Sequence, residues 1–242
     1  MLKYINGEIY RLLHKRSMYI YFPAMAVGYV LLAYIRSGGF TESSIVNDAI
    51  NLFNFLPILA GGFLFSAVYT DDLNSKNLIS LVGFGLSKTK IVFSKLFLMT
   101  LFGTVVFGLT PVLHCGFYGF LGWPADAGTW ATVYLIALKF LLTTIAFSAL
   151  AGIVVYGLLR TTFSIVLYIL LAFGVISGLL TTALNTFAPG LIVFLMPNIS
   201  NGITVGLMGG GPVALPVFQY VVYVAAAAVL SVAAFYKKEM EF

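Results

Sequence analysis

The sequence predicts an all-α polytopic membrane protein with six transmembrane helices. Hydrophobic residues make up 61% of its 242 residues and charged residues only 9%, whereas about a quarter of a soluble domain is charged. The apolar residues form long continuous runs, and a helix needs about 20 such residues to cross a bilayer. The runs do not alternate with a period of two, as the strands of a membrane β-barrel would. This composition excludes a soluble enzyme and a nucleic-acid-binding protein.

The expected spans are residues 18–35, 50–68, 96–120, 131–159, 163–184 and 216–236. Basic residues gather in the flanks on one side of these spans: Lys3, Arg11, Lys15, Arg16, Lys76, Lys88, Lys90, Lys95, Arg160, Lys237 and Lys238. The flanks on the other side hold only Arg36. We expect the chain to cross the plasma membrane several times. Because basic flanks stay on the cytoplasmic side, both termini are expected in the cytoplasm.

The segment before the first span, residues 1–17, is amphipathic. Its apolar residues recur every three or four positions and are Leu2, Ile5, Ile9, Leu12 and Leu13. Charged residues lie between them, namely Lys3, Glu8, Arg11, Lys15 and Arg16. This spacing favours a helix that lies in the membrane interface, with its basic side toward lipid phosphates or a protein partner. The alternative is a simple basic anchor for the first span.

The loop at residues 69–94 predicts two short helices on the cytoplasmic side. Asp71 and Asp72 suit the positive end of a first helix, and 83–85, which contains two glycines, ends it. Ser87 can cap a second helix that continues into the third span. A short helix in this place can transmit force from a partner to the spans. An ordinary loop along the head groups is the alternative.

The last loop, residues 185–215, is apolar but too short to cross the membrane twice. Pro189, Pro197, Pro212 and the glycines at 209–211 interrupt it. Backbone at membrane depth is tolerated where other protein covers it. We therefore expect two short re-entrant helices on the extracellular face rather than a seventh and an eighth span.

The order of these elements, together with the runs 86–91 (Leu-Ser-Lys-Thr-Lys-Ile) and 94–96 (Ser-Lys-Leu), resembles the ABC-2 type permeases. In that family an acidic residue follows the second span, and a basic turn and a Ser/Ala-Lys pair lead into the third. The resemblance covers the whole chain, 1–242, as a single transmembrane domain. It makes 1–17 the elbow helix, 69–94 the coupling loop and 185–215 the re-entrant region. Two departures are Asp71 or Asp72 in place of the usual Glu, and Asn77 near a usual Gly-Thr pair.

The resemblance implies the membrane subunit of an ATP-driven exporter. Two such subunits, identical or similar, would form a path at their interface, while a separate ATP-binding subunit would hold ATP and Mg²⁺; this chain would carry no cofactor. The cargo would be amphipathic or hydrophobic: a peptide, a bacteriocin or toxin, a lipid or a drug. The implied contacts with the ATPase in the coupling loop are Asp71, Asp72, Asn74, Ser75, Lys76, Asn77 and Leu78. The implied contacts in the elbow helix are Glu8, Arg11, Lys15 and Arg16.

The residues themselves indicate no enzyme. The stretch 82–89 lacks the glycines of a phosphate-binding loop, and it follows no predicted strand. His14 and His114 are expected on opposite sides of the membrane, so they cannot share a metal ion. An ATP-independent channel or secondary transporter, and an accessory membrane scaffold, remain as other interpretations.

Lys139 is the charged residue expected within a span. A lysine at this depth is a candidate pathway residue. Alternatively, its long side chain reaches the outer head groups while its methylene groups stay in lipid. Aromatic residues near the span ends are expected to form interfacial belts, and these are Tyr34, Trp123, Trp130, Tyr220 and Tyr236. The Gly-x-x-x-Gly pair at Gly174 and Gly178 suits close helix packing, within one chain or between two.

Overall fold

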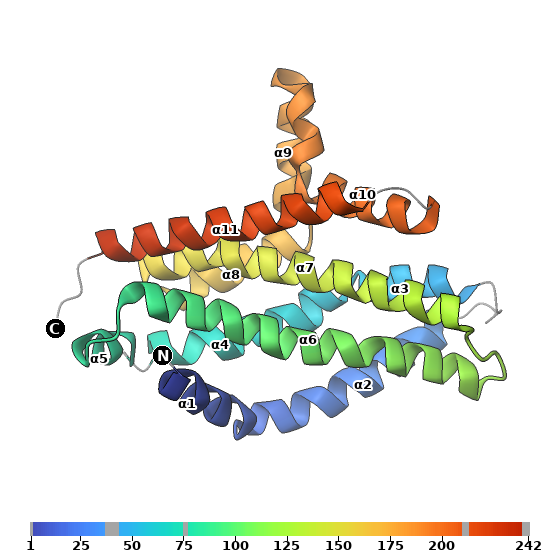
Figure 1. The fold of residues 1–242 in the computed structure, drawn as a ribbon, viewed down its shortest axis with the longest axis horizontal. Helices are drawn as coiled ribbons and strands as arrows, with labels where there is room; N and C mark the ends of the chain where they lie inside the picture. Colours follow the sequence, from blue (N-terminus) through green and yellow to red (C-terminus); the bar gives the residue numbers. More distant parts are fainter. Residues whose placement is uncertain (1, 37–43, 75–76, 210–212, 239–242) are drawn as a thin grey trace.

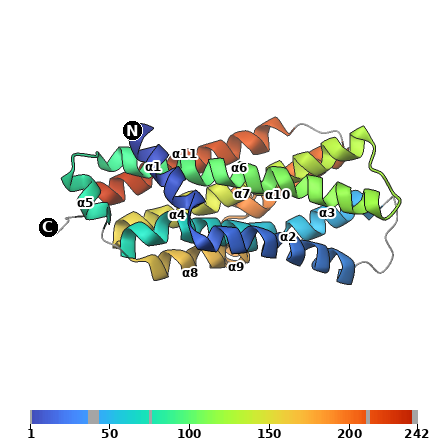
Figure 2. The same cartoon turned by 90° about the horizontal axis from the view of Figure 1, so that it is seen from below.

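The computed structural model describes residues 2–36, 44–74, 77–209 and 213–238, and these form helices joined by short turns, with no strand among them. Most of the long helices run side by side along one axis (Figures 1 and 2). Their bounds, in chain order, are α1 Leu2–Leu13, α2 Arg16–Arg36, α3 Ile45–Phe53, α4 Gly62–Asn74, α5 Asn77–Gly83, α6 Lys88–Phe120, α7 Ala127–Leu158, α8 Thr161–Ala172, α9 Val175–Phe187, α10 Met196–Gly209 and α11 Ala214–Lys237.

Five helical stretches of the described chain are long and apolar enough to cross a membrane, and a bent pair of helices makes a sixth if it counts as one span. The five are Arg16–Ile35, Ile45–Thr70, Lys88–Phe120, Ala127–Leu158 and Ala214–Lys237. The bent pair is Thr161–Ala172 and Val175–Phe187. The predicted class, a helical protein with several potential membrane spans, is thus confirmed at this level.

The second of these stretches is longer than predicted and is interrupted by a π-helical turn at Pro57–Gly61 between α3 and α4. A proline supplies no backbone N–H, and the wider turn accommodates this. The hydroxyl of Tyr168 on α8 donates a hydrogen bond to the carbonyl oxygen of Pro57 over 2.7 Å. A Cβ atom at Gly61 would overlap that hydroxyl, so glycine allows α8 to approach here.

The centre of the bundle is α7, which packs against α6, α8, α10, α11 and α3. Its first turn is capped by the carboxylate of Asp126, which accepts a hydrogen bond from the backbone N–H of Thr129 over 2.8 Å. The predicted cap at Ser87 is present on α6, where its hydroxyl accepts a hydrogen bond from the N–H of Lys90. These caps set where the two longest helices begin.

The predicted fifth span, 163–184, is not one continuous helix. It breaks after α8, and α9 leaves at an angle of 63°. Gly174 at the break has a φ of +74°, a left-handed conformation that glycine adopts without steric cost. Gly178 has open space where a side chain would be, so among the described residues no other helix packs against the Gly174–Gly178 pair.

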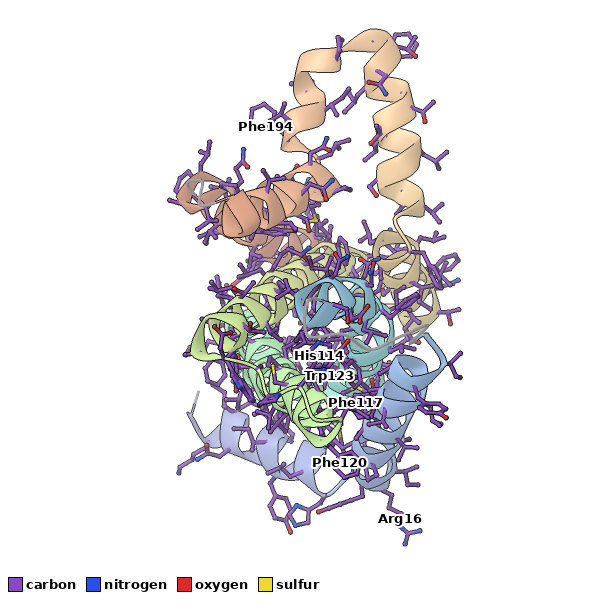
Figure 3. The ribbon with its side chains drawn as sticks, turned by 90° about the vertical axis from the view of Figure 1, so that its right-hand side faces the viewer. Arg16, His114, Phe117, Phe120, Trp123 and Phe194 are labelled. Atoms are coloured by element: carbon purple, nitrogen blue, oxygen red, sulfur yellow. The ribbon has the colours of Figure 1, made fainter. Side chains whose placement is uncertain are left out.

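The predicted loop 185–215 contains a 3-10 turn at Pro189–Phe194 followed by α10. Figure 3 shows that α9 stands away from the bundle and that the chain returns past Phe194 toward α10. No residue of α9 is buried, whereas Met196, Ile199 and Ile203 of α10 pack on α7 and α11. Within 185–215 the described residues thus form one α-helix, α10, which is held against the bundle, and one 3-10 turn, whereas α9 belongs mostly to the predicted fifth span and stands apart.

Candidate functional site: the Lys139 cavity

A polar cavity lies beside Lys139 on α7. Lys139 is about 18 Å along the helix from Ala127, at about 1.5 Å per residue. Its side chain bends toward α10, where Nζ donates a hydrogen bond to Oγ1 of Thr204 over 2.9 Å. Only 6% of the residue is exposed. The lysine thus points into the protein against α10, and little of its side chain is exposed at the surface.

The cavity has a volume of about 430 Å³ and is open on one side. It lies among α3, α7, α10 and α11 and the bend between α8 and α9. Its polar lining includes Asn51, Asn54, Lys139, Thr143, Ser177, Ser200, Asn201, Thr204 and Tyr220. Its apolar lining includes Phe140, Phe147, Leu171, Phe173 and Met196. A cavity with so many polar groups, set among helices that are apolar enough to cross a membrane, is a candidate binding site.

One turn along α7 from Lys139, Thr143 and Tyr220 form a buried polar pair. The hydroxyl of Thr143 donates to the carbonyl oxygen of Lys139 over 2.9 Å, which uses its only proton. Tyr220 must therefore be the donor in its own contact of 2.9 Å with Thr143. Tyr220 is fully buried, so the predicted place in an interfacial belt is wrong for this residue. The pair ties α11 to α7 at the wall of the cavity.

A second cluster joins α1 to α6. The Nζ atom of Lys95 and an Nη atom of Arg11 both contact the carboxylate of Glu8, over 2.7 Å and 2.8 Å. Lys95 is 1% exposed and Glu8 is 8% exposed. Burial acts to raise the pKa of Glu8, but the two cations outweigh it and hold that pKa below its ordinary value. Glu8 is charged at neutral pH and faces α6.

A third cluster ties α2, α3 and α6 near the opposite end of the bundle. Nε2 of His114 lies 2.8 Å from the carbonyl oxygen of Ile45, an acceptor, so Nε2 carries the proton. Nδ1 then accepts a hydrogen bond from the hydroxyl of Tyr29 over 2.5 Å. The hydroxyl of Tyr118 donates to the carboxylate of Asp48. His114 is thus a buried structural residue, while His14 is exposed directly after α1.

The expected coupling-loop residues are only partly described. The backbones of Asp71, Asp72 and Asn74 form the last turn of α4, and Asn77 begins α5. The side chains of these four lie outside the described part of the chain, as do Ser75 and Lys76 entirely. Leu78 is buried. In the expected elbow, Glu8 points inward, Arg11 and Lys15 are half-buried and Arg16 is exposed at the start of α2.

The sequence singled out Lys139 but not the side chains that surround it. Thr143 follows Lys139 by four residues, which places both on one face of a helix. From this spacing the sequence could have predicted that the two residues line the same site. Thr204 and Tyr220 come from distant segments, and no local pattern connects them to Lys139. Comparison of the chain with models of protein families, with curated proteins and with solved structures finds no match.

Proposed function

We propose that this chain is the membrane-spanning subunit of an ATP-driven exporter that moves an amphipathic or hydrophobic cargo out of the cell. A separate subunit would bind ATP and Mg²⁺ at the cytoplasmic face. A second copy of the chain, or a similar chain, would complete the complex. Residues 1–17 would serve as the elbow helix, 69–94 as the coupling loop and 185–215 as the re-entrant region. The support for this proposal is the resemblance in sequence and the arrangement of one end of the bundle.

The observation that carries the proposal is that α1, α5 and the last turn of α11 lie at one end, which we call the basic end (Figures 1 and 2). There α5 connects α4 to α6, and its Leu78 is only 4% exposed. Nζ of Lys88 at the start of α6 donates to the carbonyl oxygens of Phe235 and Lys238, over 2.8 Å and 2.9 Å. A force on α5 would therefore reach α4, α6 and α11 together.

The α1 helix reaches the same set of helices by another route. Its Glu8 is held by Lys95, which lies two turns into α6 from Lys88. A partner that moved α1 would thus act on α6 as well. The contacts of Lys88 and Lys95 thus attach α6 at two points, to α11 and to α1. This arrangement favours a subunit that receives motion from a soluble partner over a channel that works without one.

The first test is extraction of the tagged chain from its native cell in a mild detergent, followed by mass spectrometry of the proteins that co-purify. We expect a soluble ATP-binding protein in a one-to-one ratio. A second membrane chain in the same peak would indicate a heteromeric pair. Recovery of the chain alone as a defined oligomer would contradict the proposal, and ion-flux measurements in liposomes would then test the channel alternative.

The second test reverses the charges expected at the coupling loop. Asp71→Lys combined with Asp72→Lys should abolish co-purification of the ATPase while the chain still elutes as a single species. The control is Asp126→Asn, which removes a carboxylate at the opposite end of the bundle and keeps a residue that can cap α7. Equal ATPase recovery with the charge-reversed chain and with the control would contradict the coupling role.

A further inference from the structure

We propose that the Lys139 cavity binds the anionic head group, a carboxylate or a phosphate, of an amphiphile whose hydrocarbon chain leaves through the open side of the cavity. That this amphiphile is the exported cargo rests on the proposed function. The binding site itself rests on the charge, the polar groups and the shape of the cavity.

Lys139 brings a positive charge to the cavity. An ammonium group has three donors, and Thr204 accepts one of them. Among the described residues no carboxylate forms an ion pair with Lys139, since the ion pairs found there join Glu8 to Arg11 and Lys95. A buried charge without a counter-ion is costly in a membrane-embedded protein. An anion in the cavity would supply the missing charge and accept the remaining hydrogen bonds.

Three asparagine side chains share the cavity with Lys139. Asn51 lies on α3, Asn54 directly after it, and Asn201 on α10. None of the three side-chain amides makes a hydrogen bond to another described residue, and each amide can donate two. With Lys139 they give four donor groups around one space. No acidic residue is among the described residues that line it, so the lining favours an anion over a cation.

The size and the apolar wall of the cavity suit an amphiphile. A volume of about 430 Å³ is within the range of about 300–1,000 Å³ of small-molecule sites, and it suffices for a head group. Leu171 and Phe173, at the bend between α8 and α9, and Phe147 on α7 contribute apolar side chains to the lining. Phe173 is 63% exposed, so this apolar wall continues to the outside of the bundle. A head group at Lys139 could thus keep its hydrocarbon chain against aromatic and aliphatic side chains.

The experiment measures binding to the full chain in nanodiscs of zwitterionic phosphatidylcholine. The probes are radiolabelled dodecanoate, which carries a carboxylate, and dodecyl phosphate. Dodecyltrimethylammonium and dodecyl maltoside serve as cationic and neutral competitors of the same chain length. Binding to empty nanodiscs is subtracted. We expect one saturable site per chain for at least one anionic probe, with no displacement by the cationic or the neutral competitor.

The variants test whether Lys139 holds the head group. Lys139→Met should weaken binding of the anionic probe by about 10- to 100-fold, the loss of a hydrogen-bonded charge. Lys139→Arg, which keeps the charge, should retain saturable binding. The control is Lys90→Met, which removes an exposed lysine at the start of α6, and its affinity should equal that of the unaltered chain. If Lys139→Met does not elute as a single species, Asn201→Leu takes its place. Weaker binding of the anionic probe to Asn201→Leu, together with the competitor results, would then support the site, and unchanged affinity would contradict it.

Each outcome bears on the proposal. Preference for dodecanoate would point to carboxylate-bearing amphiphiles, and preference for dodecyl phosphate to phosphate-bearing lipids; either supports the site. Non-saturable binding, equal displacement by all competitors, or unchanged affinity in Lys139→Met would overturn it. No ATPase takes part in the measurement, so its failure leaves the exporter proposal standing. Lys139-dependent binding by a chain that recruits no ATPase would keep the site and remove the cargo assignment.

Discussion

Replacing Glu8 with Gln should loosen α1 from α6, because Glu8 is the carboxylate that Lys95 and Arg11 share. Lys95 is 1% exposed, so it cannot reach water when its carboxylate is removed. Loss of one partner of a buried ion pair costs about 3–5 kcal/mol. We expect Glu8→Gln to lower the free energy of unfolding by an amount in this range.

The reverse change should cost less. Lys95→Met leaves Glu8 in contact with Arg11 over 2.8 Å, so one charge-assisted hydrogen bond remains. The expected loss is about 1.5–3 kcal/mol, the contribution of one hydrogen bond to a charged group. In the double variant Glu8→Gln with Lys95→Met, neither of these two charges is buried without the other. Its loss in free energy of unfolding should be smaller than the sum of the two single losses by about 2 kcal/mol, within the range for directly contacting residues.

Unfolding would be followed by denaturant titration of the purified chain in detergent micelles, and release of α1 by limited trypsin digestion. Trypsin should cut faster at Lys15, between α1 and α2, and at Arg16, the first residue of α2, in Glu8→Gln than in the unaltered chain. Lys90→Met is the matched control for Lys95→Met, since it is an exposed lysine on the same helix and should change stability by less than about 0.5 kcal/mol. Additive losses, or equal digestion rates, would refute the view that this ion cluster docks α1.

Three further predictions concern other parts of the molecule. The pKa of Glu8 is lowered in the folded chain, so its contribution to stability is complete at neutral pH and declines as the pH falls through that lowered pKa. The pKa of Asp126 is lowered as well, so a melting series across acidic pH should show a decline in both chains, steeper in the unaltered chain than in Glu8→Gln. Gly61→Ala should lower the free energy of unfolding by about 1–3 kcal/mol, because the added Cβ atom displaces Tyr168. The loss should be smaller in a Tyr168→Phe background, where the clashing hydroxyl is absent. Equal losses in both backgrounds would contradict the contact. Gly174→Ala places a side chain at a φ of +74°, so it should lower the free energy of unfolding by about 1–2 kcal/mol. It should also weaken dodecanoate binding, and an unchanged affinity would show that the bend does not shape the binding site.

The helical class and the approximate places of the apolar stretches could be predicted because they depend on local properties of the chain. Runs of apolar residues of sufficient length are visible without any knowledge of packing. Caps are equally local, and Ser87 is found at the position where its side chain was expected to cap a helix. Element boundaries were less accurate. The stretch predicted at 50–68 begins at Ile45, and the predicted fifth span breaks after Ala172, whereas the helix that starts at Lys88 and carries Lys95 into the third stretch is the one that the cap at Ser87 predicted.

The roles of individual charged residues were harder to predict than the helices. Glu8 was expected to face a partner subunit, but in the structure its carboxylate contacts Lys95, 87 residues further along the chain. Tyr220 was expected at an interface, but its hydroxyl is buried against Thr143. In both cases the polar group is satisfied by a residue far away in sequence, and a hydropathy pattern contains no information on such pairs. The orientation of a polar side chain is decided by packing between helices.

The break at Gly174 and the cavity at Lys139 are one feature of the fold. The chain turns back at Leu159 and Arg160, so α8 runs antiparallel to α7, and the ring of Tyr168 meets that of Phe147. At equal rise on two antiparallel helices, the Tyr168–Phe147 contact would place Ile176 of a straight continuation of α8 at the level of Lys139. A helix in that position would occupy space that now belongs to the cavity. Because the chain bends by 63° after Ala172 instead, α9 leaves the bundle, and the space beside Lys139 is lined by polar residues of α3, α10 and α11. The glycine that allows the bend therefore also allows a buried lysine to face a cavity.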